Sequence, residues 1–173
     1  MPWLQVDDFR LALQLATTPI THSDLHFFIA TPNVWSTPVA ALADHLERVA
    51  EIVSASLEWV IEHYLVTPYP IILEGDGITP ALAARWVFQE AEGKGRVTAV
   101  CLHDDDPNRL HANMLNRGRS FDRGHDAART AQVQMNVLYS ERLRRKSQNL
   151  GLPVLTVHPQ ETLVERAVGL LSH

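Results

Sequence analysis

The chain has 173 residues and a formal net charge of −5, from 15 Lys and Arg against 20 Asp and Glu, which argues against nucleic acid as a partner. A single cysteine excludes an internal disulfide, and no apolar run approaches the roughly 20 residues that cross a bilayer. With no signal-peptide pattern at the N-terminus, we expect one cytoplasmic domain over residues 1–173 that does not contact a membrane.

Predicted strands and helices alternate along the chain. Four apolar runs predict strands, and the capped or amphipathic segments between them predict helices. In chain order the expected elements are a strand over 2–6, a helix over 7–16, an irregular cap over 18–37, a helix from 38 to the "TPYP" segment at 67–70, a strand over 70–74, a helix over 79–93, a strand over 95–102, a partly helical charged segment over 104–124, a helix over 125–151, a strand over 152–157 and a helix over 158–173.

The two inner strands decide the expected fold class. The runs at 70–74 and 95–102 are apolar without alternation, which is typical of strands that are covered on both faces. Helices separate every pair of strands, as in proteins with a parallel sheet. We therefore expect an α/β protein in which helices cover both faces of a mostly parallel sheet.

Charged or polar side chains follow each predicted strand. Ligands in open α/β sheets bind beyond the carboxyl ends of the strands, so these positions are candidates for a functional site. Three of the four strand ends are acidic. The groups are Asp7, Asp8 and Arg10 after the first strand, Glu74 and Asp76 in "EGDG" after the second, His103 to Asp106 after the third, and His158 and Pro159 after the fourth.

Acidic strand ends facing arginines are the groups that phosphoryl transfer uses. Carboxylates orient a hydroxyl group or hold hydrated Mg²⁺, and guanidinium groups neutralise charge on the transferred phosphoryl group. The segment "NRGRSFDRG" supplies Arg117, Arg119 and Arg123 between glycines, which is the composition of an arginine lid. We place this lid at 104–124.

In this order the motifs resemble those of the P-loop small-molecule kinases, and within them the 2-phosphoglycerate kinase-like and zeta-toxin-like proteins. The resemblance rests on "PWLQVDDFRLAL", "PIILEGDGITP", "LNRGRSF" and "GLPVLTVHPQETLVERA", and it covers nearly the whole chain. It implies a three-layer P-loop kinase-like fold that uses Mg²⁺ and transfers phosphate from ATP to a small hydroxyl-bearing acceptor.

The resemblance also implies roles for individual residues. Asp7, Asp8 and Arg10 would face the acceptor, with Asp8 preferred as the base or hydroxyl orienter. Glu74 and Asp76 would hold Mg²⁺ through water or position the acceptor. On the nucleotide side, Arg117, Arg119 and Arg123 would contact the phosphates, and the segment with His158, Pro159 and Thr162 would border adenine.

One departure from the family pattern is large. The phosphate loop G-x-x-x-x-G-K-[ST], with a strand before it and a helix after it, should precede "PWLQVDD", and it is not in the sequence. The only Gly-Lys pair, Gly93-Lys94, has Phe88 where the first glycine of the loop should stand. The resemblance therefore implies an N-terminally incomplete domain without its central strand, unless the fold closes the gap in another way, such as a homodimer.

Other interpretations of the same residues stay open. Asp7 and Asp8 could stabilise the start of a helix, and the glutamate and aspartate of "EGDG" could form a plain turn. Trp35 in the cap could line an acceptor pocket or pack under a loop. Two other functions compete: a binding or interaction module that lost the nucleotide loop, and a metal-dependent phosphatase or hydrolase that uses Asp7, Asp76 and Asp104.

Overall fold

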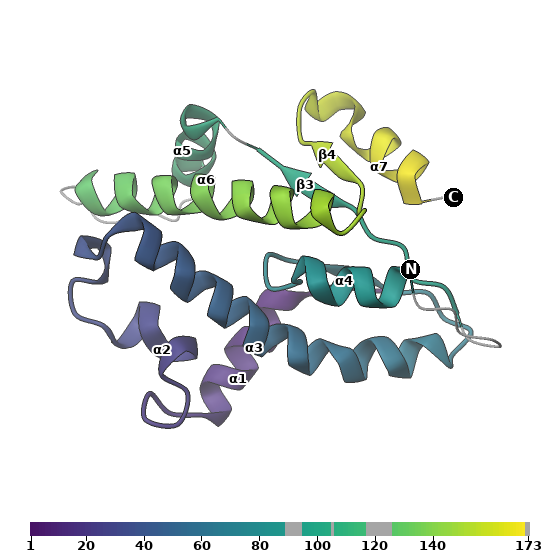
Figure 1. Ribbon diagram of the computed structural model, residues 1–173, viewed down its shortest axis with the longest axis horizontal. Helices are drawn as coiled ribbons and strands as arrows, with labels where there is room; N and C mark the ends of the chain where they lie inside the picture. The colour runs from purple at the N-terminus through teal and green to yellow at the C-terminus, as the bar shows by residue number, and fades with distance from the viewer. Residues whose placement is uncertain (89–94, 105, 117–125, 172–173) are drawn as a thin grey trace.

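The structure is a computed structural model that describes residues 1–88, 95–104, 106–116 and 126–171 (Figure 1). Of these residues 66% are helical and 8% lie in strands. The elements are β1 (Trp3–Gln5), α1 (Val6–Ala16), α2 (Ser23–Ala30), the 3-10 helix η1 (Val34–Ser36), α3 (Val39–Leu65), β2 (Ile72–Glu74), α4 (Pro80–Val87), β3 (Cys101–His103), α5 (Pro107–Asn116), α6 (Asp126–Asn149), β4 (Val154–Thr156), the 3-10 helix η2 (Gln160–Thr162) and α7 (Leu163–Leu171).

The predicted three-layer P-loop kinase-like fold with a mostly parallel sheet is wrong. The strands form two separate parallel pairs, β1 with β2 and β3 with β4. Most of the strand predicted at 95–102 has no regular structure, because β3 begins only at Cys101. A strand is stable where its backbone N–H and C=O groups are hydrogen-bonded to another strand. Among the described residues, β2 and β3 are each paired with another strand on one side only.

The helices agree better with the sequence. The long helices α3 and α6 lie where hydrophobic periodicity placed them. Thr79 caps α4 as expected, since its Oγ1 accepts a hydrogen bond from the Leu82 N–H at 3.2 Å. The segment 18–37, predicted to be irregular, instead contains α2 and η1. None of the helices in the described residues is both long enough and apolar enough to cross a membrane.

Helix α3 is the centre of the molecule. Figure 1 shows it running between α1 and α2 on one side and α6 on the other. Its buried side chains recur every three or four residues and join two apolar clusters, one with α1 and α4 and one with η1 and α6. The buried apolar residues of α3 are Leu42, Ala43, Leu46, Val49, Ala50, Val53 and Leu57.

Ser54, on the buried face of α3, holds the turn that follows β2. Its Oγ donates a hydrogen bond to the Gly77 C=O at 2.8 Å and accepts one from the Thr79 N–H at 3.0 Å. We expect Ser54→Ala to lower the free energy of unfolding by about 1–3 kcal/mol, because both backbone groups lose their partner. Ser56→Ala, on the same helix, should change it by less than about 0.5 kcal/mol. Urea denaturation measures both, and equal losses would contradict the assignment.

Candidate functional site

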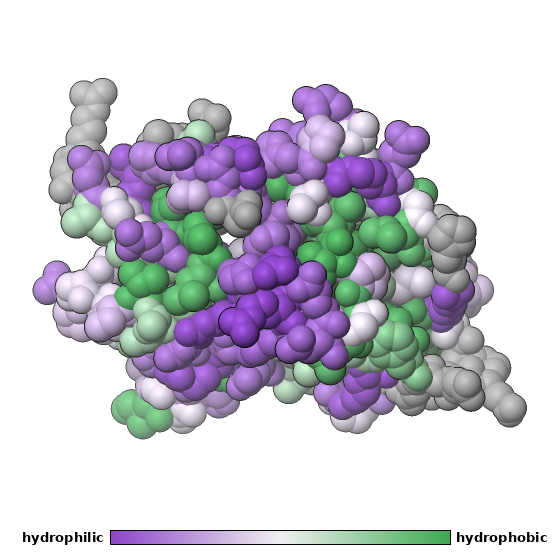
Figure 2. Space-filling model, turned by 45° about the horizontal axis from the view of Figure 1, so that its top comes forward, coloured by the Kyte–Doolittle hydropathy of each residue, from purple (hydrophilic) through white to green (hydrophobic). Residues whose placement is uncertain are grey.

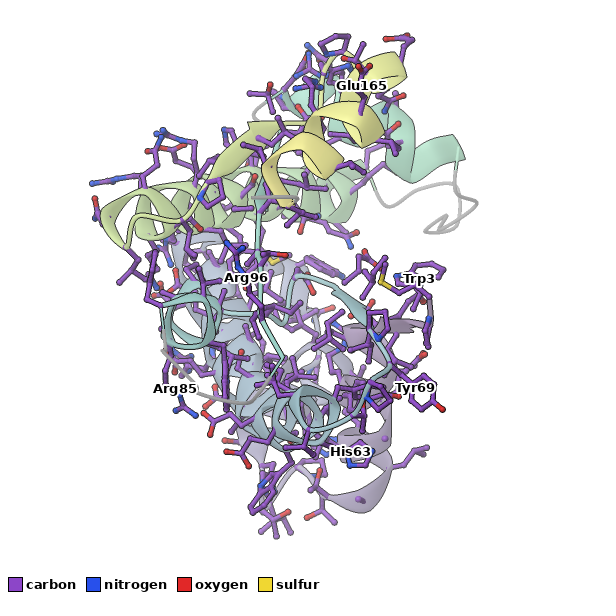
Figure 3. The ribbon with its side chains drawn as sticks, turned by 90° about the vertical axis from the view of Figure 1, so that its right-hand side faces the viewer. Trp3, His63, Tyr69, Arg85, Arg96 and Glu165 are labelled. Carbon is purple, nitrogen blue, oxygen red and sulfur yellow. The ribbon has the colours of Figure 1, made fainter. Side chains whose placement is uncertain are left out.

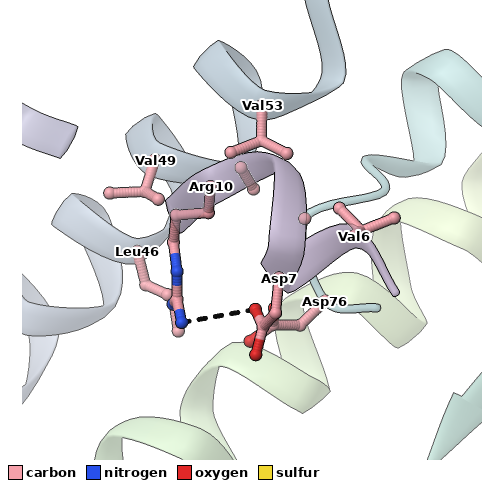
Figure 4. A pocket seen from close by; sticks show the side chains of 9 residues that line it. Val6, Asp7, Arg10, Leu46, Val49, Val53 and Asp76 are labelled. Carbon is pink, nitrogen blue, oxygen red and sulfur yellow. Dashed lines mark ion pairs between the residues drawn. The ribbon is translucent and has the colours of Figure 1, made fainter. Parts of the chain in front are cut away.

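A small pocket opens where α1 and the turn after β2 meet the middle of α3 (Figure 4). Asp7 and Arg10 from α1 and Asp76 from the turn supply its polar groups. The cavity volume is about 10 Å³, close to the roughly 10–15 Å³ that one water molecule needs. The pocket therefore admits one group the size of a hydroxyl. Its apolar wall is formed by Val6, Leu46, Val49, Ala50 and Val53.

The pairing of β1 with β2 brings the two carboxylates together. Their parallel register places Gln5 opposite Glu74. Asp7 and Asp76 each follow two residues later, so both emerge at the same end of the strand pair. The structure thus joins two predicted site residues that are far apart in the sequence.

Two glycines let the turn after β2 pass over Val6. Gly75 has a φ of +151°, and a Cβ on it would lie 2.8 Å from the Val6 Cβ. A Cβ on Gly77 would lie 2.8 Å from the Val6 Cγ1 and 3.1 Å from the Val53 Cγ1. The two glycines of "EGDG" therefore permit the close approach that places Asp76 beside α1.

Arg10 gives the pocket a positive charge and a free donor. Its Nη2 lies 3.3 Å from the Asp7 Oδ1, and both side chains are partly exposed. The Arg10 Nε is buried and has no hydrogen-bond partner within the described part of the chain. Figure 4 shows the side chains of Arg10, Asp7 and Asp76 converging at the pocket. An oxygen of a bound molecule would satisfy this donor.

Asp76 is the carboxyl group best suited to accept a proton. The residue is exposed as a whole, like Asp8 and Glu74, yet protein atoms crowd around its carboxylate, and this desolvation together with the charge of Asp7 raises its pKa. The nearby Arg10 offsets part of the effect, whereas Glu74 adds to it. A carboxyl group with a raised pKa is a better general base than an ordinary aspartate.

The raised pKa of Asp76 predicts a pH-dependent stability. Because the folded state holds this proton more tightly than the unfolded state, stability is lost as pH rises from the ordinary value of 3.8 through the folded-state pKa. We expect Asp76→Asn to melt at a higher temperature than the wild type at neutral pH, with the difference vanishing in acid. Thermal melts by circular dichroism test this, with exposed Asp8→Asn as the control. If the wild type were as stable as Asp76→Asn at neutral pH, the raised pKa of Asp76 would be refuted.

Tyr139 on α6 supports the site, and sequence reasoning missed it. Its hydroxyl donates a hydrogen bond to the Asp76 C=O at 2.8 Å. Burial and the negative charge of Asp76 raise the pKa of Tyr139, so the hydroxyl keeps its proton and stays a donor. No local signal in the sequence links α6 to the turn after β2, because the contact spans 63 residues.

The acidic end of β3 forms a separate group. Asp104 receives hydrogen bonds from the Arg109 Nη2 at 2.6 Å and Nε at 3.2 Å, and the His158 Nε2 lies 3.8 Å from its Oδ2. Burial opposes ionisation of Asp104, but the bonds from Arg109 and Asp106 and the charges of Arg109 and His158 outweigh it and lower the pKa. Asp104 does not line the pocket, so the three carboxylates of the phosphatase alternative are not assembled.

Several predicted site residues lie outside the pocket. Asp8 and Glu74 are exposed, although the charge of Glu74 reaches Asp76. Trp35 packs beside Phe28, with ring centroids 5.9 Å apart, on the cluster around η1. Pro159 and Thr162 are tied to α7, because Arg166 donates hydrogen bonds to the Pro159 C=O at 2.8 Å and to the Thr162 Oγ1 at 3.1 Å. The proposed lid residues Arg117, Arg119 and Arg123 fall outside the described residues.

Among the described residues no group of three or more His, Cys, Asp or Glu is arranged to hold a metal ion. Mg²⁺ is usually bound through one or two carboxylates, with water and substrate phosphates completing its shell. Glu74 and Asp76 could supply two such carboxylates, and this assignment stays a prediction.

Comparison of the chain with models of protein families, with curated proteins and with solved structures finds no match.

Proposed function

We propose that the chain carries the acceptor site of an ATP-dependent phosphotransferase, a kinase for a small hydroxyl-bearing metabolite. The observation that carries the proposal is the meeting of Asp7, Arg10 and Asp76 around a pocket that admits one hydroxyl group. The order of the sequence motifs, which resembles that of small-molecule kinases, supports it. In this proposal the protein is cytoplasmic and acts as a monomer or a homodimer. Its partner is a small molecule, and it binds neither nucleic acid nor a membrane.

In the proposed reaction the acceptor hydroxyl enters the pocket and donates a hydrogen bond to Asp76. Asp76 takes the proton while the acceptor oxygen forms a bond to the terminal phosphorus of ATP and the bond from that phosphorus to ADP breaks. Arg10 orients Asp7 and donates its free Nε–H to the acceptor oxygen in the pocket. Mg²⁺ near Glu74 and Asp76 would neutralise charge on the phosphates.

The nucleotide side of this reaction rests on the sequence alone. The phosphate loop of the family is not in the sequence. Arg117, Arg119 and Arg123 would contact the phosphates, and the loop from His158 to Thr162 would border adenine. The missing loop favours one alternative, a binding module that keeps the acceptor pocket without catalysis.

A transfer assay separates these functions. The full chain is incubated with Mg²⁺, ATP labelled in its terminal phosphate, and pools of sugars, polyols, nucleosides and hydroxy acids. The kinase proposal expects label on one class of hydroxyl compound, and loss of this transfer in Asp7→Asn and Asp76→Asn. Binding of a pool compound without transfer would establish the binding module, and release of phosphate from phosphorylated compounds without ATP would establish a hydrolase.

A further inference from the structure

The strand β2 has an edge that no strand covers in the described part of the chain. The Ile72 N–H donates to the Pro2 C=O at 2.9 Å, so the backbone groups of Ile72 face β1. In a strand, the N–H and C=O of one residue point to the same edge, and those of the next residue point to the opposite edge. The backbone groups of Leu73 therefore point away from β1, and no described strand pairs with that edge.

The strand β3 has a matching free edge. The Cys101 N–H donates to the Pro153 C=O at 2.9 Å, and the His103 C=O accepts from the Val157 N–H at 3.1 Å. Cys101 and His103, the two end residues of β3, are therefore hydrogen-bonded on the side of β4. The backbone groups of Leu102, between them, point away from β4, where the described residues offer no strand. The Leu102 C=O accepts a long hydrogen bond from the Cys101 Sγ at 3.8 Å, which a bound strand would replace.

Consecutive residues of α6 hold the ends of these two strands. The Tyr139 hydroxyl binds the Asp76 C=O just beyond β2. The Ser140 Oγ lies 2.9 Å from the Nδ1 of His103, at the end of β3. The turn after β2 and the end of β3 are therefore held at the same level along one helix.

Both strand pairs also leave large apolar side chains at the surface. Trp3 is 57% exposed, Ile72 46% and Leu102 49%, which is unusual for short parallel strands, since parallel sheets are normally covered. Figure 3 shows Trp3 pointing away from the body of the molecule. Figure 2 shows apolar side chains at the surface on both sides of a hydrophilic band.

We propose that an extended apolar segment of a separate polypeptide binds as a strand between β2 and β3, parallel to both. Its backbone would bond to the N–H and C=O of Leu73 on one side and of Leu102 on the other, as in β-strand addition. Parallel orientation follows because both existing pairs are parallel. Apolar, β-branched side chains suit the segment, because its neighbours on the two strands include the exposed Ile72 and Leu102.

Amide exchange tests this proposal on the intact chain labelled with ¹⁵N. The probe is a heptapeptide with blocked ends and the sequence KVTVIVK, and the control peptide is KVTPIVK, whose proline lacks the central N–H. At saturating concentration, the KVTVIVK peptide should slow exchange of the Leu73 and Leu102 amides at least about fivefold, because only the unbound protein exchanges them freely. The control peptide should not.

A pair of variants tests the edge itself. Leu102→Pro removes the N–H that faces the proposed strand and should abolish the protection, whereas Val154→Pro removes an N–H on the far edge of β4 and should leave it intact. Circular dichroism checks that each variant folds. Three results would overturn the proposal: peptide protection of other amides only, slow exchange of Leu73 and Leu102 in the free monomer, or protection that grows with protein concentration alone, which would indicate a second copy of this chain.

Discussion

Asp76→Asn is expected to lower phosphoryl transfer by about 10²–10⁴-fold in the active protein, the usual contribution of a general base. The substitution keeps the shape of the side chain but removes the group that accepts the acceptor's proton in the proposed reaction. Because burial and the charge of Asp7 raise the pKa of Asp76, the same change should stabilise the folded protein at neutral pH. A loss of activity together with a gain in stability distinguishes a catalytic base from a structural turn residue.

Asp8→Asn is the matched control for this prediction. Asp8 also lies in the first turn of α1 but is exposed and does not line the pocket. Steady-state kinetics should show nearly wild-type turnover for this variant. If Asp8→Asn lost as much activity as Asp76→Asn, the assignment of Asp76 as the base would be contradicted.

Gly75→Ala is expected to lower the free energy of unfolding by about 2–4 kcal/mol, from backbone strain and from overpacking of a buried contact. The φ of +151° is rarely adopted by residues with a Cβ, and the new methyl carbon would lie 2.8 Å from the Val6 Cβ. Relief of either effect would push the turn away from α1 and separate Asp76 from Asp7. Chemical denaturation measures the loss, and acceptor binding should weaken with it.

Gly169→Ala provides the control for the glycine prediction. Gly169 lies within α7, and nothing is within 4 Å of the position that its Cβ would occupy. Alanine there should raise the free energy of unfolding by about 0.5–1 kcal/mol, because it favours the helical backbone. A loss at Gly169 similar to that at Gly75 would mean that the turn is not specially constrained.

The sequence predicted the helices well and the sheet poorly, for a physical reason. Helices α3 and α6 carry their signal locally, in apolar side chains repeated along one face. Strand pairing depends on distant residues, and apolar character alone did not show that 95–100 would pair with no strand among the described residues. Helix α2 was missed because its eight residues are too few for a periodic pattern to emerge.

The acidic half of the candidate site could be predicted, because Asp7 and Asp76 directly follow strands. The structure adds the reason that they meet, namely the parallel register of β1 with β2. Tyr139 and the apolar wall from α3 could not be predicted, since their contacts cross long stretches of sequence. Asp104 was grouped with the carboxylates by its place after a strand, yet Arg109 holds it elsewhere.

Acceptor binding to the intact protein tests the central claim most directly. Saturation-transfer difference NMR with a pool of small hydroxyl compounds would be recorded for the wild type, Asp76→Asn and Asp8→Asn. We expect signals from one class of hydroxyl compound with the wild type and Asp8→Asn, and their loss with Asp76→Asn. Equal signals from all three proteins, or none from the wild type, would show that the pocket of Asp7, Arg10 and Asp76 is not an acceptor site.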